Sequence, residues 1–402
     1  MYKNIKIEKL DDFGRGICYI NDKITFVENA LPNEIVDIDL TREKSKYNEA
    51  TVVNYIEKSK DRVKYNCPYY EKCGGCNIAH LLYQKQLDYK RKKVEDIVRK
   101  YTKYKNIRIE EIYGNDNLNY RNKVTLHIQD NKIGYFEKNS KRIVNINECL
   151  LLDKSINAII GRLHRYANNN QILSSTIIIR AFNNEALMLL DKKENKEFLN
   201  FFNDINIIMD NKNIKGKDYL IDNLFDKKFK IKKDAFYQVN NNQVKVLYDI
   251  VRKIVKKSNY RSVLDLYCGT GTIGIIVSQF VDEVLGVEVN QQAIEAAIEN
   301  KKINNISNIE FILGKVEDKI DLIKGKHDLI IVDPPRSGLD KHVIDVIKKL
   351  DAKEIIYVSC DPITMARDIN YFDSHYKLEK IKCVDMFMNT YHCESVCILE
   401  RR

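Results

Sequence analysis

The sequence predicts an α/β protein whose C-terminal part, residues 231–402, folds as a Rossmann-like, doubly wound sheet. Three observations lead to this class. From Ser262 onward, strand-like apolar runs alternate with segments of helical spacing, a glycine turn follows the first run, and acidic residues end two later runs. Such alternation produces a parallel sheet that carries helices on both faces and a ligand site at the carboxyl edge of its strands.

The first 57 residues are expected to form a small β-barrel. Turn residues at Asp11 to Gly14 and at Asn21-Asp22 separate short alternating runs, which read KITFVENA, EIVDIDL and EATVVNYI. Several short strands in so small a module favour a five-stranded barrel of the OB kind. The basic turn from Arg42 to Lys46 either gives this barrel a positive rim or is an ordinary solvated loop.

Residues 58–230 are expected to form a second module with a mainly antiparallel sheet. A basic helix is predicted over residues 81–104, where apolar side chains recur at helical spacing. Its lysines fit a solvated helix face. Residues 107–230 contain strand-like runs such as KVTLHIQ and STIIIRAF, and they contain few helix signals.

The composition indicates a folded protein in a reducing compartment. Hydrophobic residues make up 44% of the chain, so a full core can form and disorder is not expected. The start lacks the apolar run of a signal peptide, and no stretch approaches the ~20 apolar residues that span a bilayer. We therefore expect a cytoplasmic protein without a membrane partner. The net charge of +10 suits a polyanionic partner but is also common in proteins that bind none.

A cofactor pocket is indicated at the first strand of the alternating region. Gly269 and Gly271 in LDLYCGTGTIG let the backbone approach a ligand, and Glu288, which ends VLGVEV, can accept hydrogen bonds from ribose hydroxyls. Together with Gly274, these glycines also match the dinucleotide pattern GxGxxG. The carboxylate of Asp265, four residues earlier, would repel a pyrophosphate but suits the cationic sulfonium of S-adenosylmethionine. The methyl donor is therefore favoured over a dinucleotide.

Three later residues are candidates for the chemistry. Asp333 is followed by two prolines, which form either a stiff loop over the pocket or a plain turn. Cys360 ends the strand EIIYVSC, where open α/β sheets bind ligands. A lone cysteine is usually buried and inert, but this position favours a nucleophile with a lowered pKa. Glu394 in NTYHCE is the candidate base, with His392 as the alternative and a surface acid as the plain interpretation.

The ten cysteines are expected to serve metal binding or catalysis rather than disulfides, because the compartment is reducing. Three of them lie within ten positions, and a fourth follows after 72 intervening residues; they are Cys67, Cys73, Cys76 and Cys149. Zinc sites tend to use two CxxC pairs, and this set has one. The spacing favours a [4Fe–4S] cluster over zinc or unbound thiols.

With these motifs in place, the chain resembles the RNA (uracil-5-)-methyltransferases, in particular the bacterial 23S rRNA enzymes that carry an iron–sulfur cluster. The resemblance covers nearly the whole chain. The segment from Lys6 through FGRGICYINDKITFVENALPNEIV looks like a TRAM domain, CPYYEKCGGC with NECLLL looks like the cluster site, and FYQVN is similar to the family's FxQVN motif. The remaining motifs follow in the family's order: LDLYCGTGTIG, VLGVEVN, DPPRSG, VSCDP and NTYHCE.

The resemblance implies a class I methyltransferase fold and a role for each matched residue. The nucleophile falls on Cys360, the base on Glu394, and the cofactor contacts on Gln238, Tyr267, Glu288 and Asp333. The four spaced cysteines become ligands of a [4Fe–4S] cluster with a structural or RNA-binding part. The resemblance also implies RNA as the partner, no required protein partner, a monomer, and a basic helix that can pack on the catalytic domain.

Two other functions stay open. The first is methylation of the T-loop uracil of tRNA, although members of that branch generally lack the TRAM domain and the cluster. The second is a non-catalytic RNA-binding protein, which the intact VSCDP and HCE motifs disfavour.

Overall fold

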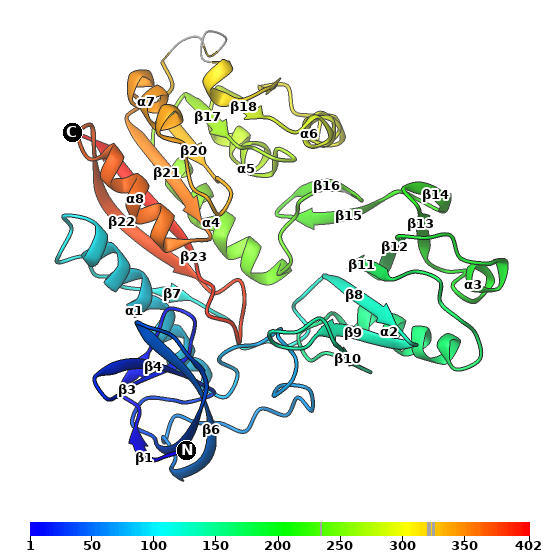
Figure 1. The fold of residues 1–402 in the computed structure, drawn as a ribbon. Helices are drawn as coiled ribbons and strands as arrows, with labels where there is room; N and C mark the ends of the chain where they lie inside the picture. Colours follow the sequence, from blue (N-terminus) through cyan, green and yellow to red (C-terminus); the bar gives the residue numbers. More distant parts are fainter. Residues whose placement is uncertain (234, 320–322, 324–325) are drawn as a thin grey trace.

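The computed structural model describes residues 1–233, 235–319, 323 and 326–402, and it shows three bodies. The N-terminal barrel lies below the C-terminal α/β body, and the central sheet lies to one side of both (Figure 1). None of the helices in these residues is long and apolar enough to cross a membrane.

The C-terminal body is built on an eight-stranded sheet with the order β19-β18-β17-β20-β21-β23-β22-β7. Its strands are β7 Ile112–Tyr113, β17 Ser262–Leu266, β18 Glu283–Glu288, β19 Ile309–Leu313, β20 Leu329–Val332, β21 Glu354–Ser359, β22 Tyr376–Val384 and β23 Glu394–Arg401. The strands from β17 to β21 are parallel, as predicted. The prediction of a wholly parallel sheet is wrong beyond β21, because β23 runs antiparallel between β21 and β22. The short connection from β22 to β23 permits only an antiparallel pair.

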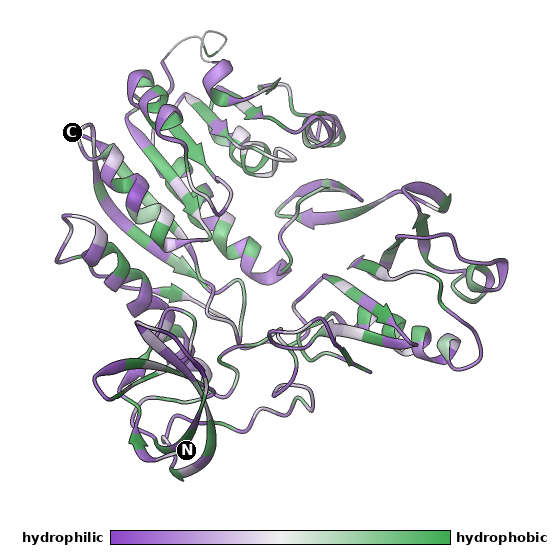
Figure 2. Ribbon diagram, in the orientation of Figure 1, coloured by the Kyte–Doolittle hydropathy of each residue, from purple (hydrophilic) through white to green (hydrophobic). Residues whose placement is uncertain are grey.

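Helices cover both faces of this sheet, because successive strand residues point to opposite sides. The helices are α1 Tyr83–Tyr101, α4 Asn241–Lys257, α5 Thr272–Val277, α6 Gln291–Ile303, α7 Lys341–Leu350 and α8 Pro362–Phe372, with short 3-10 turns at Ser278–Phe280 and Val316–Asp318. Val263 packs in one core with α4 and α5, whereas Leu264 packs in the other with α1, α7 and α8. Figure 2 shows hydrophobic residues along the sheet strands and hydrophilic residues on the outer helix faces.

The basic helix α1 belongs to the C-terminal body although its sequence precedes the central sheet. Its Val94 and Val98 lie in the same core as Leu264 and Ile330. The strand β7, which follows α1, pairs with β22 at the sheet edge. The chain therefore enters the C-terminal body, leaves it for the central sheet and returns.

The N-terminal body is a six-stranded barrel with the order β1-β5-β6-β4-β3-β2. Its strands are β1 Tyr2–Lys6, β2 Lys9–Leu10, β3 Gly16–Ile20, β4 Lys23–Glu28, β5 Ile35–Glu43 and β6 Tyr47–Glu57. The sequence predicted five strands, and the sixth is the two-residue β2. The basic turn at residues 42–46 is exposed.

The central body has a seven-stranded sheet with the order β10-β9-β8-β11-β12-β13-β14. Its elements are β8 Lys123–Gln129, β9 Lys132–Phe136, β10 Ile143–Asn145, α2 Lys154–Ala167, β11 Thr176–Phe182, β12 Glu185–Leu190, α3 Lys196–Phe201, β13 Asn206–Met209 and β14 Lys212–Lys215. All pairs are antiparallel except β12 with β13. The mainly antiparallel sheet is as predicted, and two helices accompany it: Asp153 caps the longer one, α2, whose Ile156, Ile160 and Leu163 reach the core.

A separate hairpin, β15 Tyr219–Leu224 with β16 Lys227–Lys232, spans the expected boundary at residue 230. It packs against α6, where Asn300 and Asn304 accept hydrogen bonds from the backbone N–H groups of Lys230 and Lys228 at 2.7 and 2.8 Å. The hairpin therefore contacts the C-terminal body, and it also contacts the central sheet, where the Asn183 side-chain amide donates to the Ile221 carbonyl at 3.0 Å.

Candidate active site and cysteine cluster

Five predicted site residues lie at one edge of the C-terminal sheet. Tyr267, Asp333 and Cys360 follow the last residues of β17, β20 and β21, and Glu288 is the last residue of β18. Glu394 begins the antiparallel β23, which starts at this same edge. Because parallel strands present their carboxyl ends together, the sequence-distant residues form one row.

Cys360 and Glu394 are neighbours on paired strands. Ser359 of β21 pairs with Ser395 of β23, so the next step along this antiparallel ladder sets Cys360 beside Glu394. The thiol is half-buried, and Glu394 is only 5% exposed. The charge of Asp333 acts on both groups. A candidate nucleophile, a candidate base and a second acid therefore share one pocket.

The Cys360 thiol is protonated in the free protein. Burial, followed by the negative charges of Glu394 and Asp333, raises its pKa from 9.0 to about 11, and the Arg336 guanidinium only partly opposes this. The prediction of a lowered pKa is therefore wrong, because burial and two neighbouring carboxyl groups both disfavour the thiolate. Sequence reasoning did not single out Arg336, although it ends the DPPR run that carries Asp333.

The acids of the site also titrate near neutral pH. Burial, with the charge of Asp333 added, raises the pKa of Glu394 to about 8, and burial raises the pKa of Asp333 to about 7. Groups with such values can exchange protons at physiological pH. The alternative base His392 differs, because burial and nearby cations such as Arg336 lower its pKa to about 4. Glu394 is therefore the better candidate for a base at neutral pH.

The raised pKa of Glu394 predicts a pH-dependent stability difference. The folded protein holds the proton more tightly than the unfolded chain, so this group favours folding at low pH. That contribution is lost as the pH rises from about 4.5 to about 8. The melting temperature of the wild type should therefore fall relative to that of Glu394→Gln across this range. A difference that does not change with pH would contradict the assignment.

The glycine turn leaves open space at the strand edge. The backbone N–H groups of Gly269 and Asn290 donate to the two carboxylate oxygens of Glu288 at 3.1 and 2.8 Å. Gly269 has a φ of +55°, and an added Cβ would meet no described atom within 4 Å. Asp265 accepts from the Gly274 N–H at 2.9 Å, while its other carboxylate oxygen is buried and has no partner among the described residues. Open space and an unsatisfied acceptor fit a cationic methyl donor.

We expect Glu288→Ala to weaken cofactor binding by about 1–3 kcal/mol, as for a lost charge-assisted hydrogen bond. This loss of affinity includes the hydrogen bond by which Glu288 stabilises the Gly269 turn. Titration calorimetry with S-adenosylhomocysteine measures the effect. Glu295→Ala, at an exposed position on α6, is the matched control. Equal affinities of the two variants would show that Glu288 has no part in binding.

Gln238 reaches the same pocket from the segment before α4. It is 7% exposed, and its backbone carbonyl accepts from the Asn122 amide at 3.1 Å. Its side chain hydrogen-bonds to Tyr248, whose pKa is raised by burial and by the charges of Asp333 and Glu394, among others. Sequence reasoning missed Tyr248, and the only signal was its place on the apolar face of α4.

The four predicted cluster ligands come together from two distant segments. The charges of the other three raise the pKa of the Cys76 thiol beyond the effect of burial. Burial, followed by the charge of Cys149, raises the pKa of both Cys67 and Cys73, and Cys67 also acts on Cys73. The structure therefore brings Cys149 to the 67–76 loop.

Tyrosine hydroxyls surround these thiols. Tyr65 neighbours Cys76, and Tyr135 neighbours Cys149. No group of three or more His, Cys, Asp or Glu side chains in the described ranges is placed to hold a metal ion. The thiols are thus close neighbours, and the structure does not show a metal site.

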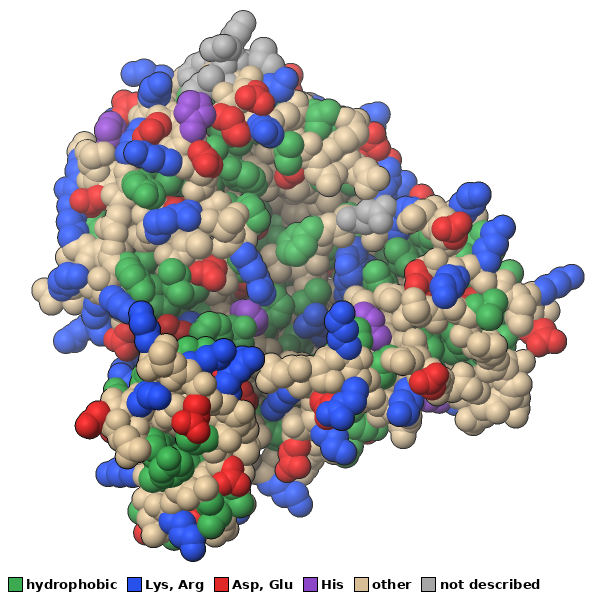
Figure 3. All heavy atoms as spheres, viewed as in Figure 1, with side chains coloured by type: hydrophobic (Ala, Val, Ile, Leu, Met, Phe, Trp, Pro, Cys, Tyr) green, Lys and Arg blue, Asp and Glu red, His purple; other side chains and the backbone are tan. Residues whose placement is uncertain are grey.

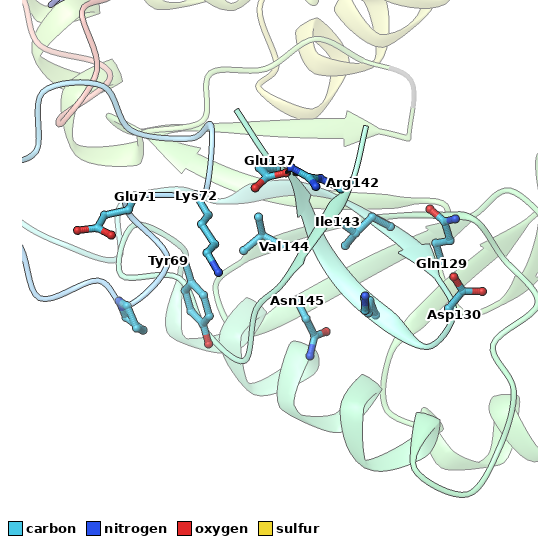
Figure 4. Close-up of a pocket in the computed structure, with 12 residues that line it drawn as sticks. Tyr69, Glu71, Lys72, Gln129, Asp130, Glu137, Arg142, Ile143, Val144 and Asn145 are labelled. Atoms are coloured by element: carbon cyan, nitrogen blue, oxygen red, sulfur yellow. Dashed lines mark hydrogen bonds and ion pairs between the residues drawn. The ribbon is translucent and has the colours of Figure 1, made fainter. Parts of the chain in front are cut away.

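A cavity of about 530 Å³ lies beside the cysteine loop in the central body (Figure 4). Side chains of Tyr69, Lys72, Arg142, Val144 and Asn145 line it, and none of the catalytic residues does. Figure 3 shows a separate hollow where the three bodies meet, with Lys and Arg side chains around it. A polyanion could approach the strand edge through that basic hollow.

Comparison with known proteins agrees with this geometry. A family model for tRNA (uracil-5-)-methyltransferase matches residues 82–402, and a TRAM domain model matches residues 2–53. An uncharacterized RNA methyltransferase of Clostridium tetani is 33% identical over 440 residues, covering 98% of this chain and 95% of the relative. One from Fusobacterium nucleatum is 33% identical over 442 residues, covering 99% and 95%.

A solved structure resembles the whole chain. The Pyrococcus abyssi tRNA (uracil-54, C5)-methyltransferase, in complex with S-adenosyl-L-homocysteine, has a TM-score of 0.81 and 26% identity, and the match covers 99% of both chains. That coverage includes the N-terminal barrel. The order of the catalytic strands, the row of residues at their edge and the match over residues 82–402 lead to one conclusion. The chain is an S-adenosylmethionine-dependent RNA methyltransferase that belongs to the tRNA (uracil-5-)-methyltransferase family.

Proposed function

We propose that the chain, acting as a monomer, methylates carbon 5 of a specific uridine in 23S rRNA. The main observation behind this reaction is the row of residues at the strand edge. Cys360 lies there beside Glu394, and the charge of Asp333 raises the pKa of both groups. The rRNA assignment is supported by the cysteine pattern CPYYEKCGGC with NECLLL, whose four thiols are gathered in the fold.

Cys360 is the nucleophile of this proposal because uracil carbon 5 is too weak a nucleophile by itself. The half-buried thiol first loses its proton to solvent. The thiolate then adds to carbon 6, and the electron pair of the carbon 5–carbon 6 double bond moves to the carbonyl oxygen at carbon 4. Carbon 5 of this enolate can then take the methyl group. The thiolate leaves at the end, when the double bond re-forms.

Glu394 takes the proton from carbon 5 after methyl transfer. The electron pair of that carbon–hydrogen bond re-forms the double bond to carbon 6 and expels the Cys360 sulfur. A pKa of about 8 suits this step, because a base with a pKa near the working pH both accepts and releases protons. Arg336, which lowers the pKa of both groups, favours their charged forms.

S-adenosylmethionine supplies the methyl group, and its sulfonium charge next to the acids would lower the raised pKa of the Cys360 thiol. We propose that Gln238, Tyr267, Glu288 and Asp333 bind it. The open space at Gly269 and the unsatisfied oxygen of Asp265 support this placement.

We propose a [4Fe–4S] cluster as the ligand of the four gathered thiols: Cys67, Cys73, Cys76 and Cys149. The donor set fits, since all four are soft ligands and each thiolate of such a cluster binds a different iron. With four cysteines bound, no iron has an open position, so the cluster would stabilise the loop.

We further propose that RNA binding and methyl transfer are carried out by different parts of the chain. Residues 1–57 and 58–230, apart from α1 and the β15–β16 hairpin, bind RNA, and residues 231–402 carry out methyl transfer. Phe236, two positions before Gln238, is 78% exposed. An exposed aromatic ring beside the pocket is suited to stack on an unpaired base.

A uridine of tRNA is the second candidate, and the Pyrococcus abyssi likeness favours it. The argument that tRNA enzymes lack the N-terminal barrel does not apply to that protein, because its match covers 99% of this chain. The test is to incubate the purified protein with labelled cofactor and either 23S rRNA or tRNA transcripts, and then to map 5-methyluridine. Methylation of tRNA alone would overturn the rRNA assignment and leave the chemistry intact.

A further inference from the structure

We propose that Asn389 is a positioning residue that couples the cysteine loop to the segment carrying the base Glu394. This inference rests on the proposed function, since it assumes that Glu394 removes the proton. Asn389 lies in the connection between β22 and β23, five positions before Glu394. It is 1% exposed and has a φ of +67°.

Every polar group of Asn389 is hydrogen-bonded. Its backbone N–H donates to the Gln86 side-chain oxygen at 3.0 Å, and its side-chain oxygen accepts from the Gln86 amide at 3.0 Å. Its side-chain amide donates to the Tyr65 hydroxyl at 3.2 Å. Its backbone carbonyl accepts from the N–H groups of Asn77 and Ile78 at 2.9 and 3.1 Å. A buried and fully satisfied network of this kind rigidifies the chain around it.

These bonds lead to the thiols by two routes. Tyr65, which accepts from the Asn389 side chain, also neighbours Cys76, and each of the two groups shifts the pKa of the other. Asn77, which donates to the Asn389 carbonyl, is the residue after Cys76. Cys76 is therefore linked to Asn389 by two paths, one through the side chain of Tyr65 and one through the backbone of Asn77.

Most of the rest of the connection is fastened to α1, and Met388 adds a packing contact with Cys76 and Cys149. Lys90 of α1 forms a fully buried ion pair with Asp385 at 2.5 Å and donates to the Phe387 carbonyl at 3.0 Å. Lys93 donates to the Tyr391 carbonyl at 3.1 Å. Bonds from α1 thus fix residues 385, 387 and 391 of the segment before Glu394. In the middle of this segment, Asn389 is hydrogen-bonded both to Gln86 of α1 and to the cysteine loop. An ordered cysteine loop therefore helps to fix the direction from which Glu394 reaches the substrate.

The test compares two variants with the wild type in the full-length protein as purified. Asn389→Gly keeps the left-handed backbone and its carbonyl bonds but removes the side chain. Tyr65→Phe removes only the hydroxyl and is the choice if the first variant does not fold. Asn305→Gly, an exposed asparagine with a φ of 53°, is the matched control.

Two readouts separate positioning from general stability. Hydrogen exchange should quicken at the amides of residues 389–395 in both variants, at least tenfold in Asn389→Gly, and not in the control. On RNA deuterated at uridine carbon 5, the isotope effect on turnover should rise, because proton removal slows, while the adduct with 5-fluorouridine RNA forms at the wild-type rate. Wild-type exchange and isotope effects in both variants would overturn the coupling. A wild-type protein that forms no 5-fluorouridine adduct would instead overturn the proposed function.

Discussion

Replacing Cys360 with alanine is expected to abolish methylation and the covalent complex with RNA. The proposed reaction begins with a bond from this sulfur to carbon 6 of uracil, so the loss should be on the order of 10⁴-fold or more in turnover. Fluorine at carbon 5 cannot leave as a proton does, and the wild type should therefore remain attached to 5-fluorouridine RNA in the presence of the cofactor. Denaturing gel electrophoresis with labelled RNA detects this complex.

Cys393→Ala is the matched control for this experiment. Cys393 adjoins Glu394 and is 2% exposed; its thiol neighbours Cys383 and donates to the backbone carbonyl of Glu394 at 3.5 Å, so it touches neither the Glu394 carboxyl group nor Cys360 through a hydrogen bond. It should retain the adduct, and its thermal stability reports any packing loss. An adduct that survives in Cys360→Ala, or that maps to another side chain, would refute the nucleophile assignment.

Replacing Glu394 with glutamine is expected to stop the reaction one step later. The isosteric amide keeps the buried shape of a side chain that is 5% exposed, but it cannot take the carbon 5 proton. Turnover should fall by about 10²–10⁴-fold, the range for loss of a general base. A methylated covalent complex should accumulate even on ordinary uridine RNA, and mass spectrometry of the trapped peptide identifies it.

His392→Gln separates the two candidate bases. The pKa of His392 is lowered to about 4, so its imidazole is a weak base at neutral pH, and this variant should turn over without trapping RNA. If His392→Gln accumulates the methylated complex and Glu394→Gln does not, the roles are reversed.

The row of residues at the strand edge could be predicted from the sequence. In a parallel sheet, a local pattern that marks the end of each strand also shows which distant residues lie together. An apolar run followed by Tyr267, Asp333 or Cys360 marks a strand end, and parallel strands must end at one edge. The sequence marked Glu394 as the candidate base, but its position needed the tertiary structure. Glu394 begins a strand, and only the antiparallel direction of β23 brings it to that edge beside Cys360.

The protonation state of the site residues could not be predicted from the sequence. Residue types suggested an activated thiol at Cys360, whereas its pKa is raised to about 11 by burial and by the carboxyl groups of Glu394 and Asp333. A pKa depends on distances between groups that are separated by tens of residues in sequence, and motif spacing does not contain those distances.

By itself, the sequence determined the class of the catalytic sheet, the residues at its edge and the four cysteines that gather at one loop, because each is marked by a short pattern. Only the tertiary structure decided that α1 packs on the catalytic body and that Asn389 ties the cysteine loop to the base segment. Such contacts arise between side chains whose neighbours are chosen by packing of the whole chain, and no periodicity or spacing within a segment encodes them.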